Sequence, residues 1–299
     1  MHASPLRDLV RAFSPADFAP RGQHHKLANP RSRQRAHPFT PLDKARPHGC
    51  KDSTRRVGAE AFDSDRYGDE NLAWWTPLLV ELGGIAAGQR VLDVGCATGG
   101  FAIAIAEWTG AQVIGCDLSL PFLDYPRTKP AGGVGWTAGN AQRLPFVGEA
   151  FDCVVMSLVL HQVADRGRAV AEAFRVLGTP GVLVVRTILP EDVAGRIPFR
   201  FFPTLAFWQA ALMPSLDELA GWASVAGFDR IRSHRVRRDK RLRLEEVEGS
   251  FRREAARRYP FLSQQELDEG MARMRVDWER QGGQWIDPRP TQFLIATKR

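Results

Sequence analysis

The clearest hydrophobic pattern in the chain runs from position 90 to position 117. It begins with a short apolar run, VLDV at 91–94, which ends at glycine and is typical of a strand buried on both faces of a parallel sheet. A glycine-rich turn follows. The proline-free stretch at 101–108 then predicts a helix, and the apolar residues at 111–116 predict a second strand. The segment therefore predicts a strand–helix–strand unit.

Other stretches predict further elements of an α/β protein. Residues 62–82 predict a short lead-in and an amphipathic helix. Ser215 with Glu218, and Ser263 with Glu266, have the spacing of capping boxes, so each pair predicts the start of a helix. One strand is predicted within 151–163, and further strands are predicted at 181–185, 228–236 and 292–297. We expect the basic stretch at 235–243 to be a solvated edge or loop.

Two carboxylates stand at the ends of the first two predicted strands. Asp117 lies where a carboxylate can accept hydrogen bonds from two ribose hydroxyls, which indicates a nucleoside ligand. A dinucleotide site would need a middle glycine, but Ala97 occupies that part of the turn. Asp93 would repel a phosphate pair and attract an ammonium or sulfonium group. S-adenosylmethionine is the cationic nucleoside that fits.

At this point the chain resembles the class I S-adenosylmethionine-dependent methyltransferases, and among them the small-molecule group that includes ubiquinone and menaquinone biosynthesis enzymes. The resemblance covers roughly residues 60–299 and rests on five motifs in order: VLDVGCATGG, the strand end at Asp117, GNAQRLPF at 139–146, FDCVVMSLVLHQV at 151–163 and PGVLVV at 180–185. It implies a Rossmann-like α/β fold, with a seven-stranded, mostly parallel sheet, helices on both faces and a lid insertion after the fifth strand.

The resemblance also implies a cofactor site. Asp93, Gly95 and Gly99 would line its methionine and ribose region, with Cys96 in the same turn. Asp117 would hold the ribose, with Leu118 beside it. Asn140 and Ala141 would meet the adenine edge, Ser157 would lie beside the methionine end, and Tyr67 would be the covering residue closest to the cofactor. Two positions depart from the family pattern, because Ala97 and Asn140 stand where a third glycine and an aspartate are common.

A general base, where the acceptor needs one, titrates best near neutral pH. His161 is our candidate, because it follows the fourth predicted strand at the carboxyl edge of the sheet, where open α/β folds bind ligands. The alternative is that His161 caps or braces that loop.

The segment at about 189–214 is rich in aromatic residues and falls where this fold inserts a lid. Its uncharged part is interrupted by prolines and is too short to span a bilayer. We expect Phe202, Phe207 and Trp208 to line the acceptor pocket, which favours an apolar or aromatic acceptor. The alternative is that these side chains simply pack on the sheet.

Charge divides the chain into two parts. Residues 1–58 hold twelve lysines and arginines against four acidic residues, whereas the rest is nearly neutral. Prolines and weak periodicity in residues 1–58 predict a disordered tail, followed by one methyltransferase domain at 59–299. This tail could be a nucleic-acid-binding arm, a targeting segment, or a stretch without function that is not translated.

The four cysteines show no metal-ligand spacing, and buried thiols in a reducing cytoplasm are the simplest interpretation. No metal is expected.

Three functions remain open. The first is direct displacement of the cofactor's methyl group by a small acceptor, with the enzyme aligning the reactants and excluding water. The second is methylation of RNA or another nucleic acid with the help of the basic tail. The third is cofactor binding without catalysis. No membrane span is predicted, a nucleic-acid partner is disfavoured by the neutral folded part, and the oligomeric state is left open.

Overall fold

The computed structural model describes residues 68–126, 132–259 and 261–299. The predicted tail at 1–58, with Cys50, and the predicted cofactor contact Tyr67 lie outside the described residues.

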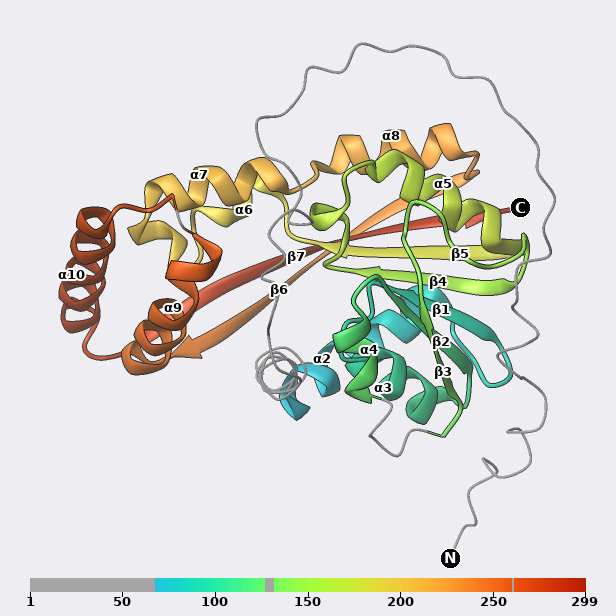
Figure 1. Cartoon of the computed structure of the whole chain (residues 1–299), viewed down its shortest axis with the longest axis horizontal. Coiled ribbons are helices and arrows are strands. Elements are labelled where there is room, and N and C mark those ends of the chain that lie inside the picture. Colours follow the sequence, from blue (N-terminus) through green and yellow to red (C-terminus); the bar gives the residue numbers. More distant parts are fainter. Residues whose placement is uncertain (1–67, 127–131, 260) are drawn as a thin grey trace, which may run out of the picture.

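Seven strands form one sheet in the order β3-β2-β1-β4-β5-β7-β6 (Figure 1). β7 is antiparallel to both of its neighbours, and the five strands from β3 to β5 are parallel. The strands are β1 Arg90–Val94, β2 Gln112–Asp117, β3 Val134–Ala138, β4 Phe151–Ser157, β5 Leu177–Thr187, β6 Arg230–Leu242 and β7 Trp285–Lys298. The predicted Rossmann-like sheet is confirmed.

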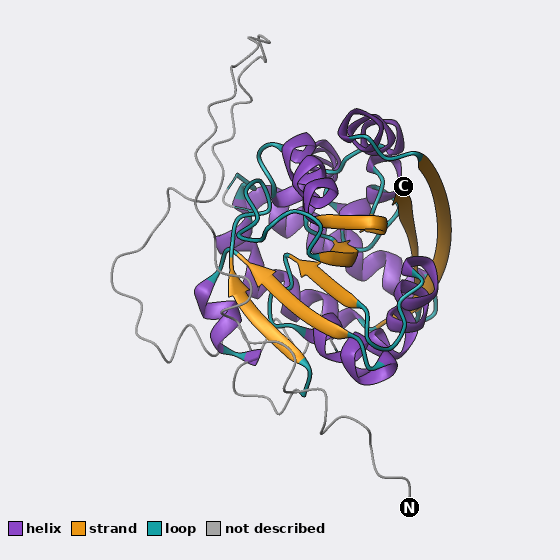
Figure 2. Cartoon of the chain, turned by 90° about the vertical axis from the view of Figure 1, so that its right-hand side faces the viewer, coloured by secondary structure: helices purple, strands orange, loops and turns teal. Residues whose placement is uncertain are grey.

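Helices connect these strands and cover the sheet on both faces (Figure 2). They are α2 Asp69–Gly83, α3 Gly100–Thr109, α4 Leu120–Asp124, η6 Leu160–Gln162, α5 Arg166–Val176, α6 Pro190–Val193, η7 Phe199–Phe201, α7 Pro203–Leu212, α8 Leu216–Ala226, α9 Leu244–Arg258 and α10 Gln264–Arg280. The two predicted capping boxes are confirmed at the starts of α8 and α10. No helix among the described residues is both long and apolar enough to cross a membrane.

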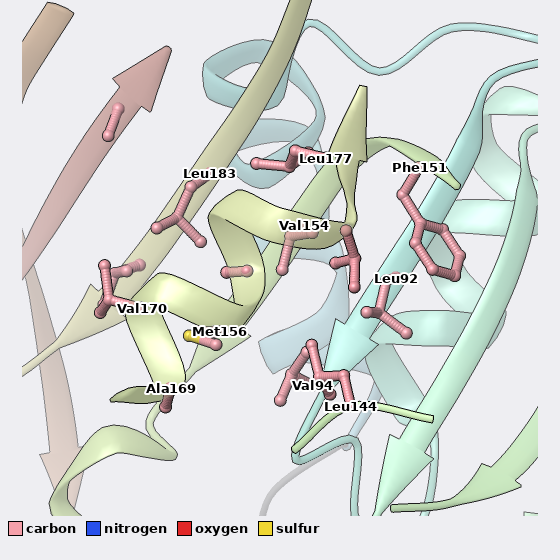
Figure 3. Packing of buried hydrophobic residues seen from close by; sticks show 14 of the residues in the cluster. Leu92, Val94, Leu144, Phe151, Val154, Met156, Ala169, Val170, Leu177 and Leu183 are labelled. Atoms are coloured by element: carbon pink, nitrogen blue, oxygen red, sulfur yellow. The ribbon is translucent and has the colours of Figure 1, made fainter. Parts of the chain in front are cut away.

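The alternation of side chains along the strands divides the apolar core between the two faces of the sheet. On one face, residues such as Leu92 and Val154 pack against α5 and α8 (Figure 3). On the other face, their chain neighbours Val91 and Val155 pack against α2 and α3. Because successive side chains of a strand point to opposite faces, each central strand contributes to both layers. Because β1, β2, β4 and β5 are parallel, their carboxyl ends meet at one edge of the sheet, which the two apolar layers support from both sides.

The last two strands extend beyond the rest of the sheet. β5 pairs with β7 only from Gly181 to Thr187, whereas β6 and β7 stay paired as far as Leu242 and Trp285 (Figure 1). The far part of β6 and β7 is therefore a two-stranded ribbon. The predicted strand at 228–236 is confirmed but is longer than expected. Of our two expectations for 235–243, the solvated edge agrees with the structure, because β6 is the edge strand of the sheet and most of its residues there are exposed or half-buried; the loop does not, because strand pairing continues to Leu242.

A third apolar cluster lies at the end of this ribbon. It joins η7, α7, α9 and α10 to Leu242 and Trp285, and we call these helices, with α6, the distal helical unit. Phe202 is at its centre, 2% exposed and stacked on Phe251 with ring centroids 4.4 Å apart. The predicted lid segment at 189–214 is thus one part of a unit to which the residues between β6 and β7 also contribute.

Gly270 in α10 tests the packing of this unit. A Cβ at Gly270 would meet the buried ring of Phe202, whereas a Cβ at Gly221, in α8, would have no atom within 4 Å. We expect Gly270→Ala to lower the free energy of unfolding by about 1 to 3 kcal/mol through overpacking, in spite of alanine's better helix propensity. The matched control Gly221→Ala should raise it by about 0.5 to 1 kcal/mol. Urea unfolding measures both, and equal effects of the two substitutions would contradict the packing described.

Candidate functional site

A cavity of about 810 Å³ lies at the carboxyl edge of the parallel strands. Its floor contains the last residues of β1 and β2, Val94 and Asp117, together with Ser157 of β4 and Arg186 of β5. Residues of the distal helical unit and of the ribbon continue the wall at the other end. Ligands of open α/β proteins bind at this edge, and the volume lies within the range of small-molecule pockets.

Asp117 holds the glycine turn in place. Its Oδ2 accepts a hydrogen bond from the Ala97 amide at 2.9 Å, and its Oδ1 accepts one from the Ser119 amide at 2.8 Å. Ala97 has a positive φ of 48°, a conformation in which glycine is more comfortable. Asp117 lines the cavity, so its oxygens can also accept hydrogen bonds from a ligand.

Asp93 is almost completely enclosed below this turn. Its side chain is 2% exposed, and burial, with a smaller contribution from the charge of Asp117, raises the pKa of Asp93 to about 7. A cation in this end of the cavity would favour the charged carboxylate and lower that pKa again. Asp93 itself does not line the cavity, so it would act on such a cation only at a distance.

The loop after β3 carries the predicted adenine contacts. Asn140 and Ala141 line the cavity, and Asn140 Oδ1 accepts the amide proton of Gln142 at 2.9 Å. Glu172 of α5 supports this loop from below by accepting the Leu144 amide proton at 2.9 Å. Burial would raise the pKa of Glu172, but its hydrogen bond to Arg175 and the attraction between them outweigh that effect and lower it.

Arg186 is a site residue that we did not predict. It is 8% exposed, lines the cavity, and donates from Nη1 to Ser157 Oγ at 3.1 Å. Its guanidinium carbon lies 4.0 Å from the ring centroid of Trp75 and 5.6 Å from that of Phe101. A single arginine at the end of the otherwise apolar strand GVLVVR was the available signal, because burying a charge in a core strand needs a specific reason.

His161 also lines the cavity, from the short helix η6 after β4. Its Nε2 lies 3.4 Å from Nε2 of Gln162, which lines the cavity as well. The position agrees with a catalytic base and also with a bracing residue, so both interpretations continue to apply.

The three predicted acceptor contacts do not line this cavity, which corrects our expectation. Phe202 is buried in the third apolar cluster, Phe207 is 79% exposed, and Trp208 packs edge-on against Tyr259. Helical periodicity explains the difference, because only one side of a short amphipathic segment can face a cavity. The same segment contributes other residues to the wall: Val193, Arg196, Phe199, Gln209 and Met213.

Three predicted cofactor contacts do not line the cavity either: Asp93, Cys96 and Gly99. Cys96 is buried, and its burial raises the pKa of the thiol. Gly99 is needed for packing, because a Cβ there would clash with the ring of Trp136. Gly95 and Leu118 do line the cavity. Among the described residues, no three histidine, cysteine or acidic side chains are placed to hold a metal ion.

The far end of the cavity carries positive charge. Arg196, Arg238, Lys240 and Arg289 line it there, and two of these, Arg238 and Lys240, belong to the basic stretch that we expected to be solvated.

Comparisons with known proteins agree on one family. A family model described as "Methyltransferase domain" matches residues 92–185. The ubiquinone/menaquinone biosynthesis C-methyltransferase UbiE of Edwardsiella ictaluri is 33% identical over 181 residues, which are 52% of this chain and 72% of that protein.

Solved structures share the fold. A chain from Anabaena variabilis, described as a methyltransferase from an antibiotic biosynthesis pathway, has a TM-score of 0.58 at 20% identity and covers 78% of this chain and 99% of its own. Phosphoethanolamine N-methyltransferase 2 of Haemonchus contortus, solved with phosphomonomethylethanolamine and S-adenosylhomocysteine, has a TM-score of 0.53 at 20% identity; the match covers 86% of this chain and 59% of that one.

The raised pKa of Asp93 predicts a pH dependence of stability. Between about pH 4 and 7 the folded protein holds a proton on Asp93 that the unfolded chain releases, so this residue's contribution to stability falls as pH rises through that window. Asp93→Asn cannot ionise. We therefore expect its stability relative to the wild type to be about 2 to 3 kcal/mol more favourable at pH 8 than at pH 5. Urea unfolding at both pH values measures this difference. The exposed control Asp217→Asn should show no such change, and parallel profiles of wild type and Asp93→Asn would refute the assignment.

Proposed function

The chain belongs to the class I S-adenosylmethionine-dependent methyltransferases, and we propose that it transfers the methyl group by direct displacement to a small acceptor with an apolar or aromatic body. The observation that carries the proposal is the continuity of this cavity, which extends from Asp117 past Arg186 to the distal helical unit. One cavity can therefore hold cofactor and acceptor side by side.

The residues at the Asp117 end fit the cofactor. S-adenosylmethionine supplies an electrophilic methyl group on a sulfonium. Asp117 has oxygen lone pairs for the ribose hydroxyls, and Asn140 with Ala141 would meet the adenine edge. Asp93 supplies negative charge below the turn, where it would favour the ammonium or sulfonium.

We assign Arg186 to the methionine carboxylate. Asp117 and Arg186 stand on β2 and β5, three strand spacings or roughly 14 Å apart in the sheet, a distance that two side chains and the ribosyl-methionine part of the ligand can bridge together. Ser157 and the faces of Trp75 and Phe101 hold the guanidinium in place. An arginine positioned in this way can bind a carboxylate with two parallel hydrogen bonds.

The acceptor would occupy the space under the segment 189–214. Phe199, Val193 and Met213 supply apolar surface there. These residues replace Phe202, Phe207 and Trp208 in our account of an apolar pocket wall. Where the acceptor must lose a proton, His161 is the cavity residue that we propose as base; the enzyme's other contributions are alignment and exclusion of water.

Two alternatives differ in what they predict. A nucleic-acid methyltransferase would need a route for a polymer into the cavity, and a cofactor-binding protein without catalysis would not need an acceptor space. The apolar wall from the distal helical unit favours a small acceptor over both. A cytoplasmic location is part of our proposal and is supported by the buried thiols of Cys96, Cys116 and Cys153.

Methyl transfer itself is tested with labelled cofactor. We expect the full chain, given S-adenosylmethionine with a radiolabelled methyl group, to place label in the small-molecule fraction of a cell extract. Separation of the reaction products by size and solubility measures this. Label in RNA would support the nucleic-acid alternative, and cofactor binding without label in any fraction would support the non-catalytic one.

The role of Arg186 is tested with a ligand that lacks the carboxylate which Arg186 is proposed to bind. Wild-type protein should bind S-adenosylmethionine at least tenfold more tightly than decarboxylated S-adenosylmethionine, because the second lacks the carboxylate. In Arg186→Met this preference should disappear, while the melting temperature confirms folding. The exposed control Arg232→Met should keep the wild-type preference. Titration calorimetry gives the affinities of the wild type and of each variant for both ligands. An unchanged preference in Arg186→Met would exclude the assignment.

A further inference from the structure

The cavity has charges of opposite sign at its two ends. Asp117 is the one acidic side chain among the described residues that line it, whereas five cationic side chains line it. Three of these, Arg238, Lys240 and Arg289, stand on the β6–β7 ribbon, on the far side of the sheet from β2. We call these three the ribbon cations.

Strand register places the ribbon cations on one face. Arg238 and Arg289 are direct cross-strand partners, and Lys240 follows two residues after Arg238. Because residues two apart in a strand share a face, all three side chains emerge on the same side as Leu242, which anchors the third apolar cluster. Like charges placed opposite each other across a ladder destabilise a sheet unless other groups compensate them.

The described residues neutralise the positive charge of the ribbon cations only in part. Arg289 Nε donates to Oδ2 of the fully buried Asp287 at 2.7 Å, and the other Asp287 oxygen accepts the Ile197 amide proton. Arg238 donates to Asn71 Oδ1 at 2.6 Å and pairs at 3.0 Å with Glu70, whose side chain is 87% exposed. Lys240 stands directly opposite Asp287 in the ladder, but both oxygens of that carboxylate already accept the hydrogen bonds just described, and no ion pair within 4 Å joins Lys240 to an acidic side chain of the described residues.

Apolar side chains adjoin this positive charge. Phe199, Met213 and Tyr259 line the same cavity and come from the distal helical unit and its ends. A ligand that satisfies both kinds of surface has an apolar body and an anionic group. Resting on the function proposed above, we propose that the ribbon cations bind a carboxylate or phosphate group of the acceptor, whose apolar body lies against the distal helical unit.

Burial favours a small anion over a nucleic-acid backbone. The Arg238 and Arg289 side chains are 11% and 30% exposed. Phosphate contacts to a polymer need cations that a long strand can reach from outside, whereas these cations face a cavity that the distal helical unit borders. Charged groups that are partly withdrawn from water also attract an anion more strongly than exposed ones do.

The test uses the full chain with saturating S-adenosylhomocysteine and three probes of similar size: phenyl phosphate, benzoate and benzyl alcohol. By titration calorimetry we expect at least one anionic probe to bind with a dissociation constant at least tenfold below that of neutral benzyl alcohol. The stronger of the two anions identifies phosphate or carboxylate as the acceptor's group.

Two adjacent residues give a matched pair of variants. Lys240→Gln should weaken the preferred anion at least tenfold and leave benzyl alcohol unchanged, and Lys240→Arg should retain anion binding. Arg241→Gln removes the same charge one residue further along, on the opposite face of β6, and should behave as wild type. Equal affinities of the three probes, or equal effects of Lys240→Gln and Arg241→Gln, would overturn the proposal.

S-adenosylhomocysteine affinity separates this proposal from the one it rests on. Wild type and Lys240→Gln should bind S-adenosylhomocysteine within twofold of each other. Absence of that binding in wild type would count against the methyltransferase site itself, whereas normal cofactor binding without anion preference would count against the ribbon cations alone. Competition of a short RNA with phenyl phosphate, lost in Lys240→Gln, would overturn the small-molecule assignment.

Discussion

The pairing of β6 with β7 beyond the end of β5 is the constraint on which the site depends. The parallel strands supply only an edge, and without the ribbon the cavity would lose the part of its wall that Arg238, Lys240 and Arg289 form at the acceptor end. The ribbon carries the distal helical unit on Leu242 and Trp285 and so turns this edge into a cavity. Backbone hydrogen bonds thus position the acceptor wall, although the strands concerned are rich in charge.

Local signals made most of the fold predictable. The apolar run of β1, the glycine turn and the capping boxes at Ser215 and Ser263 act within a few residues, so the sequence expresses them directly. The carboxyl ends of β1 and β2, with Asp93 and Asp117, could be placed together for the same reason. Parallel strands adjacent in the chain bring their ends to one edge whatever the remaining residues do.

The features that the sequence did not reveal depend on contacts between residues that are far apart in the chain. The basic residues of β6 resemble a solvated edge or loop because their partners, such as Asp192 in α6 and Asn71 in α2, are far away in the chain. Phe202 and Phe199 are three residues apart and equally aromatic, yet only the packing of α10 against Phe202 determines which of them faces the cavity. Arg186 was visible in the sequence but needed Ser157 and Trp75 to give it a role.

The separation between the third apolar cluster and the two clusters of the sheet has an evolutionary consequence. Substitutions that reshape the acceptor end repack the distal helical unit, whose core shares no buried residue with the layers that support Asp117 and the glycine turn. New acceptor preferences can therefore accumulate in this unit while the machinery for the cofactor is inherited unchanged.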